Sequence, residues 1–110
     1  MENKEKEILD NIVGSIDAYA KAPLSDYLTL SEILRTLTAN LFYLEAYRVQ
    51  ANQKWHSIYF NSEAKTNAGK EREADLKVEE LYKYRRLMTA GYRICDALRS
   101  QISISKKENN

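Results

Sequence analysis

Cationic and aromatic side chains alternate in the segment from residue 82 to residue 93. Arg86 and Arg93 are seven residues apart, so they share one face if the segment is helical, and Tyr82 and Lys83 lie within a turn of it. Single-stranded nucleic acid is bound by this combination, because cations neutralise phosphates while bases stack on rings. A solvated basic helix face would have the same composition. The candidate nucleic-acid-binding residues are Lys54, Tyr82, Lys83, Arg85, Arg86, Tyr92 and Arg93.

Residues that usually carry catalysis are few. His56 is the one histidine and Cys95 the one cysteine, and a cysteine in an apolar helical series usually packs as a small apolar residue. Glu79 and Glu80 are adjacent, so on a helix they point about 100° apart and cannot face each other. The sequence has neither a histidine and cysteine cluster at metal-ligand spacing nor a glycine-rich phosphate loop. We therefore expect a non-enzymatic protein with no catalytic residue, metal or cofactor.

Arg48 interrupts the longest apolar series of the chain. The series has the 4-3 spacing of a helix whose narrow apolar seam lies against another long helix. Arg48 either packs its stem on the seam while its guanidinium reaches a carboxylate or the surface, or marks a register-fixing contact or an oligomer lumen. The series comprises Leu30, Leu34, Leu37, Leu41, Leu44, Arg48, Ala51, Trp55 and Ile58.

The first two expected elements are helices joined by a short connector. Residues 4–21 have apolar side chains at 3-4 spacing, from Ile8 to Ile16 and including Val13, and Pro23 ends that helix. The second helix is predicted over 29–61, where Thr29 and Glu32 have the spacing of a capping box. At about 1.5 Å per residue this helix is longer than a compact chain of this size is wide, which predicts an elongated molecule.

The second half of the chain predicts a turn, a third helix and a tail. Small polar residues between 61 and 69 indicate a loop, and the helix is predicted over 70–102. Gly91 in its middle indicates either a close approach of another element or simple tolerance. Residues 103–110 are expected to be a flexible tail, or alternatively a short strand around 102–105.

Together these elements predict an all-α protein with a single helical domain over residues 1–110. The second and third helices have similar lengths, which favours a long antiparallel helical hairpin in an oligomeric helical bundle. The shorter first helix would pack across this hairpin or across a second copy. Extra aromatic residues broaden the seam and give the expected oligomer interface, which comprises Phe42, Tyr43, Tyr47, Arg48, Trp55 and Tyr59.

Charge is balanced overall but distributed unevenly along the chain. The net charge is +1, yet residues 1–34 are mainly acidic and residues 81–107 mainly basic. Such asymmetry indicates either an anionic partner or self-association of acidic with basic ends. The sequence has no apolar run long enough for a transmembrane helix and no secretory signal, and a lone cysteine fits a reducing compartment. We expect a cytoplasmic protein without membrane or small-molecule partners.

Short blocks over residues 37–103 resemble the UvsY family of phage recombination mediators. In the second helix they are Leu44-Glu45-Ala46 and the aromatic end at Tyr59, with the family's basic run represented by Lys54. In the third helix they are Leu76-Lys77-Val78, Tyr84, and Cys95 followed by Asp96-Ala97-Leu98-Arg99-Ser100. The resemblance implies a small helical homo-oligomer that binds single-stranded DNA and helps to load a recombinase, in the cytoplasm of a bacterial host.

The leading hypothesis is therefore a single-stranded DNA-binding accessory of recombination or replication that acts as a homo-oligomer. The alternative is a non-enzymatic protein–protein interaction module, such as a phage adaptor or inhibitor, that docks a partner helix on its seam. A third reading is a coiled-coil spacer whose seam is filled within a homo-oligomer.

Overall fold

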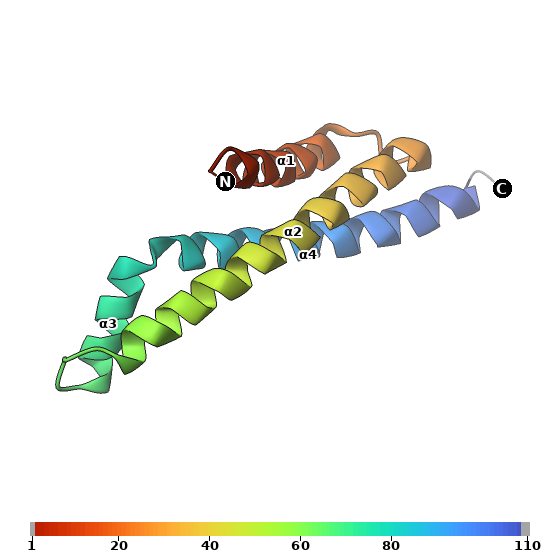
Figure 1. The fold of residues 1–110 in the computed structure, drawn as a ribbon. Helices are drawn as coiled ribbons and strands as arrows, with labels where there is room; N and C mark the ends of the chain where they lie inside the picture. Colours follow the sequence, from red (N-terminus) through yellow and green to blue (C-terminus); the bar gives the residue numbers. More distant parts are fainter. Residues whose placement is uncertain (1, 109–110) are drawn as a thin grey trace.

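The structure, a computed structural model, describes residues 2–108 and contains four helices and no strand within that range (Figure 1). The predicted all-α class is confirmed. The molecule measures 63 × 27 × 18 Å, with a radius of gyration of 18.1 Å. A compact chain of this length would have a radius of gyration near 13 Å, so the expected elongation is confirmed. Within residues 2–108, no helix combines the length and apolar composition that crossing a bilayer requires.

The first helix, α1, spans Glu2–Lys21 and lies along the N-terminal half of α2 (Figure 1). It buries Ile8, Ile12 and Ser15, which follow the helical repeat and face the rest of the protein. Val13, which we expected on the apolar face, is instead 56% exposed. It lies about 100° round the helix from Ile12, beyond the buried stripe.

The central helix, α2, spans Tyr27–Phe60 and contacts each of the other three helices. The predicted seam is its buried face, with Leu30, Leu37, Leu41, Leu44 and Ala51 in the core. The predicted capping box is wrong. Asp26 caps the helix by accepting hydrogen bonds from the Thr29 amide (3.1 Å) and hydroxyl (2.6 Å), and these bonds lower the pKa of Asp26. The helix therefore begins two residues earlier than expected, because an aspartate can satisfy the free amides of the first turn.

The single helix predicted over 70–102 is wrong, because the chain forms two helices there. The first, α3, spans Asn67–Lys77 and is capped by the Thr66 side chain, while α4 spans Glu79–Glu108. Between them Val78 leaves the helical conformation at φ −125° and ψ 62° and is itself buried. The break lets α3 pack against the C-terminal end of α2, while α4 turns away and crosses the middle of α2 (Figure 1).

The C-terminal segment is helical up to Glu108, so the flexible tail and the alternative strand are both wrong for residues 103–108. Contacts with the α1–α2 connector hold this segment. Ser105 is buried and donates a hydrogen bond to the Ser25 carbonyl (2.6 Å), and Gln101 donates one to the Leu24 carbonyl (3.0 Å). Residues 109–110 of the expected tail lie outside the described residues.

Gly91 marks the closest approach of α4 to α2. A Cβ atom at this position would lie 2.7 Å from Cδ2 of Leu41, closer than carbon atoms can approach. Of the two interpretations of this glycine, close approach is therefore the one that the structure supports. The packing of Leu41 against a bare backbone fixes where the two long helices cross.

Candidate nucleic-acid interface

Tyr82, Arg86 and Arg93 form a stripe along the solvent side of α4. All three side chains are exposed, whereas the opposite side of the helix packs on α2 through residues such as Leu81, Met88 and Cys95. On a helix Arg86 and Arg93 differ by about 20° in direction, and Tyr82 lies about 40° from Arg86. The shared face predicted for these residues is therefore a solvent-exposed surface of the folded chain. We call Tyr82, Lys83, Arg86 and Arg93 the α4 basic face.

The ring of Tyr82 and the guanidinium of Arg86 are in contact. Cζ of Arg86 lies 5.6 Å from the ring centroid, and Nη1 lies 3.4 Å from the phenol oxygen. A cation over an aromatic face is attracted by the ring quadrupole, so each side chain holds the other in place. Tyr82 nevertheless remains 66% exposed, which leaves ring surface for a stacking partner.

The cations of the α4 basic face are not neutralised by ion pairs. Among the described residues, no carboxylate lies within ion-pair distance of Lys83, Arg86 or Arg93. The acidic helix α1 runs close to α4, yet within the described part of the chain the one ion pair that joins two helices is Lys54–Glu80, at 3.9 Å. Three carboxylates lie near the face along α4: Asp96 is paired with Arg99 and Glu80 with Lys54, whereas the exposed Glu79, one turn before Lys83, is in neither pair. The face therefore keeps its positive charge available for an anion.

An open apolar groove borders this face, between α1 and α4. Leu9 of α1 and Leu87 and Ala90 of α4 form its apolar surface, and Tyr82, Lys83 and Arg86 complete its wall. Its volume is about 590 Å³. Such a groove can accept the flat apolar part of a ligand whose charged part meets the cations. The sequence did not indicate Leu9 as part of this site, because its periodicity does not say which flank of α4 the first helix approaches.

Two of the predicted residues on α4 point elsewhere. Arg85 and Tyr92 are seven residues apart and share their own stripe, about 100° from Arg86. Nη2 of Arg85 donates a hydrogen bond to the side-chain oxygen of Asn52 on α2 (3.0 Å). Arg85 lines a pocket with Tyr82 and Trp55 on the flank of the α4 basic face, whereas Tyr92 lies about 120° from Arg86.

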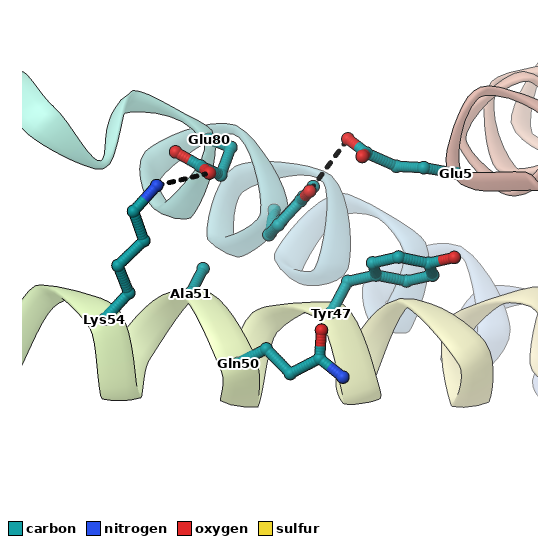
Figure 2. Close-up of a pocket in the computed structure, with 7 residues that line it drawn as sticks. Glu5, Tyr47, Gln50, Ala51, Lys54 and Glu80 are labelled. Carbon is teal, nitrogen blue, oxygen red and sulfur yellow. Dashed lines mark hydrogen bonds and ion pairs between the residues drawn. The ribbon is translucent and has the colours of Figure 1, made fainter. Parts of the chain in front are cut away.

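Lys54 lines a separate pocket at the junction of α1, α2 and α4 (Figure 2). There its ammonium group faces Glu80, and the phenol of Tyr84 donates a hydrogen bond to Glu5 (2.8 Å). Burial, followed by the hydrogen bond to Glu5, raises the pKa of Tyr84 above its ordinary value. Tyr84 is thus held neutral as a donor. The hydrogen bond between Tyr84 and Glu5 connects α4 to α1. The pocket has a volume of about 250 Å³ and is also lined by Tyr47, and Lys54 lies there, away from the α4 basic face.

The residues weighed for catalysis do not meet. Cys95 is buried between α4 and α2, with its sulfur 3.9 Å from the hydroxyl of Thr38. His56 is exposed near the other end of α2 and stacks on Phe60. No group of acidic, histidine and cysteine side chains within residues 2–108 has the arrangement of a metal site.

Most of the predicted oligomer interface is engaged within the chain. Trp55 donates an indole hydrogen bond to Asp75 on α3 (2.8 Å), and Tyr59 stacks on Trp55 with centroids 5.4 Å apart. Tyr47 packs beside Tyr84 on α4, with centroids 6.4 Å apart. These aromatic residues attach α3, α4 and the end of α2 to one another, which the sequence could not distinguish from contacts with a second copy.

Arg48, Phe42 and Tyr43 complete that predicted set. Arg48 is half-buried, and its Nε donates a hydrogen bond to Glu45 (3.2 Å), as the first of its two interpretations expected. Phe42 is 75% exposed, and Tyr43 is exposed with Lys4 of α1 over its ring at 5.7 Å. Phe42 is therefore the member of the set that has the most surface left for another molecule.

Comparison with known proteins adds no relative: no family model, no curated protein and no solved structure matches this chain.

Proposed function

We propose that this chain is a single-stranded DNA-binding accessory protein of recombination or replication that acts as a homo-oligomer. The observation that carries the proposal is the α4 basic face, where Arg86 contacts the exposed ring of Tyr82. Among residues 2–108, no carboxylate is within ion-pair distance of Arg86 or Arg93. Arginine and lysine side chains bind phosphates, and an exposed tyrosine ring stacks on a base whatever its sequence. A mediator role in loading a recombinase, in a bacterial cytoplasm, is what the family resemblance adds.

The groove beside the face supports a single strand over a duplex. In a single strand the bases are free to turn towards Tyr82 and the apolar surface of Leu9 and Leu87, while the phosphates remain with the cations. Arg86 and Arg93 are two turns apart, which corresponds to about 10 Å along the helix. The face is thus long enough for a short stretch of strand and not for an extended binding site.

Tight binding of a single strand therefore requires several protomers side by side. Three cations release few counterions, so the affinity of a single α4 basic face should be weak. Several faces on one strand raise the overall affinity, because each later contact forms at a high effective concentration. We further propose that α2 and α4, joined through α3, act as a long antiparallel helical hairpin and that such hairpins assemble into a helical bundle. The length of the molecule supports this arrangement.

The test is the binding of a short fluorescent oligothymidylate, followed by anisotropy at low and at increasing salt. We expect binding that weakens with a log–log salt slope of about −2 per protomer, since three cations contribute about −0.7 each. The variant Arg86→Gln/Arg93→Gln should bind at least tenfold more weakly and lose about two thirds of that slope.

The matched control is Arg72→Gln/Lys65→Gln, which removes the same charge from exposed positions near the start of α3. This control should keep nearly the full affinity. The proposal fails if the protein does not bind the oligonucleotide at low salt, or if the control variant loses as much affinity as the α4 variant.

A second candidate is a non-enzymatic protein–protein interaction module, a phage adaptor or inhibitor. The exposed aromatic surface at Phe42 and Phe60 of α2 favours it, because large apolar side chains that stay exposed often mark a protein interface. In that case the Arg86→Gln/Arg93→Gln variant would bind the partner protein as tightly as the wild type does.

A further inference from the structure

The outer side of α2 carries a second series with 4-3 spacing, opposite the buried seam. Every member of this series is exposed in the folded chain, although the series runs over almost the whole helix. Phe42 and Phe60 are each 75% exposed, and between them lie Ala46 and Val49. The series, here called the outer seam, comprises Leu28, Glu32, Arg35, Ala39, Phe42, Ala46, Val49, Gln53, His56 and Phe60.

The flanks of the outer seam are poor in charge. On one side of its central part lie Thr38, Glu45 and Asn52, and on the other lie Thr36, Tyr43 and Gln50. Of these six residues only Glu45 is charged, and it is already paired with Arg48. Between Ala39 and Val49 every residue of the outer seam is apolar, and a helix surface in contact with water would normally carry more charge there.

We infer that two copies of this chain pair through the outer seam, with their α2 helices antiparallel and a two-fold axis at the level of Leu44. In this register, a residue of one copy faces the residue of the second copy that lies at the same distance from position 44 on the other side of the axis. The central layers then join Phe42 to Ala46 of the second copy and Ala39 to Val49 of the second copy. Each large side chain meets a small one, which is how facing positions fill space without a clash.

The outer layers of this register are also complementary. Arg35 faces Gln53 of the second copy, Glu32 faces His56, and Leu28 faces Phe60. An imidazole N–H can donate a hydrogen bond to a carboxylate, and the last layer is apolar. A parallel pair in register would instead place Glu32 against Glu32 and Arg35 against Arg35, which repel. It would also place Phe42 against Phe42 and Ala46 against Ala46. Two large side chains would then clash in one layer, and two small ones would leave a cavity in the next.

The size of the outer seam reaches the lower limit for a specific dimer. It spans 33 residues, or about 50 Å, and with a helix about 10 Å wide it covers about 500 Å² on each copy. The total of about 1,000 Å² reaches the level at which specific interfaces begin. Helix α1 reaches one edge of the outer seam, where Glu32 and Ala46 line hollows beside it, but every member of the seam remains exposed. This pairing rests on the homo-oligomer of the proposed function and names one of its interfaces.

Cysteine cross-linking tests the register in the full chain. In a Cys95→Ala background, the double variant Ala39→Cys/Val49→Cys should form a disulfide-linked dimer under mild oxidation, because positions 39 and 49 face each other across the axis. Within one helix they are about 15 Å apart, so they cannot react with each other. The single variants Ala39→Cys and Val49→Cys are the controls and should remain uncross-linked. Efficient cross-linking of either single variant would overturn the antiparallel register.

Solution mass tests the pairing itself, without DNA. The wild-type chain should have twice its 12.8 kDa mass at micromolar concentration. Phe42→Glu should raise the dimer dissociation constant by at least about 100-fold, since each dimer loses two central aromatic anchors. Leu76→Glu, at a leucine of α3 that is 65% exposed, should leave the dimer intact, and far-UV circular dichroism checks that both variants fold.

A wild-type chain that stays monomeric at high micromolar concentration overturns the inference, as does a Phe42→Glu variant that remains dimeric. Neither result depends on DNA binding, because the mass is measured on the protein alone. Conversely, a dimeric protein that binds no oligonucleotide would refute the proposed function and leave this interface standing.

Discussion

Tyr84 links the stability of this protein to alkaline pH through its hydrogen bond with Glu5. The phenol is buried where α1, α2 and α4 meet, and it donates to the Glu5 carboxylate over 2.8 Å (Figure 2). Burial is the main cause of its raised pKa, and the acceptor carboxylate adds to it. The folded state therefore keeps the phenol neutral up to a higher pH than the unfolded chain does.

The perturbation is Tyr84→Phe, which removes the hydroxyl and keeps the ring. A hydrogen bond to a charged group contributes about 1.5–3 kcal/mol, and the half-buried Glu5 can regain water when the phenol is lost. We therefore expect the variant to be about 1.5 kcal/mol less stable at pH 7, with Tyr92→Phe as an exposed control that changes by less than about 0.5 kcal/mol.

The difference in the free energy of unfolding between the wild type and Tyr84→Phe should become smaller as the pH rises. Because the folded pKa of Tyr84 is raised, its contribution is fully present below the unfolded value of about 10 and is lost as the pH rises towards the folded value. One pH unit above the unfolded pKa this loss amounts to about 1.4 kcal/mol in the wild type. Phenylalanine has no such loss, so the two proteins should be nearly equal in stability at pH 11.

The assay is urea unfolding at pH 7 and at pH 11, followed by circular dichroism of the helices. The free energies of unfolding at zero urea give the cost of the substitution at each pH. If Tyr84→Phe costs the same at both values, the phenol does not titrate differently in the folded and unfolded chains. Our account of the pocket at the junction would then be refuted.

The remaining predictions concern the glycines and the charge of the α4 basic face. Gly91→Ala should destabilise the fold by about 1–3 kcal/mol, because its Cβ would lie 2.7 Å from Leu41. Gly14→Ala has no atom within 4 Å of its Cβ and should stabilise α1 by up to about 1 kcal/mol, so thermal unfolding of the two variants should shift in opposite directions. Glu79→Gln removes the negative charge one turn before Lys83, so oligothymidylate should bind about two- to threefold more tightly at low salt and equally at high salt.

The helices were largely predictable because their signals are local. The 4-3 spacing from Leu30 to Ile58 depends on the helical repeat alone, and its main apolar members are the core of α2. The shared direction of Arg86 and Arg93 follows from the same repeat. Where prediction failed, a contact distant in sequence had decided the outcome. Val78 leaves the helix and is buried, and Ser105 extends α4 through its bond to the α1–α2 connector.

In the candidate site, too, the local features were predictable from the sequence and the contacts between distant segments were not. Tyr82 and Arg86 could be paired from their spacing, whereas the groove that α1 forms beside them with Leu9 could not. The 4-3 spacing of the outer seam of α2 is also visible in the sequence. The sequence alone does not distinguish its ten positions from residues that face another helix of the same chain. Only the folded structure leaves them exposed.

The sequence by itself determined the helical class, the length of the central helix and the side of α4 that is basic, because periodicity and charge act within a few turns of one helix. The tertiary structure decided which aromatic residues bind their own chain, where the third helix divides and which face of α2 remains open. Those outcomes depend on how α1, α3 and α4 share the surface of one helix, and that competition is settled by packing between distant segments.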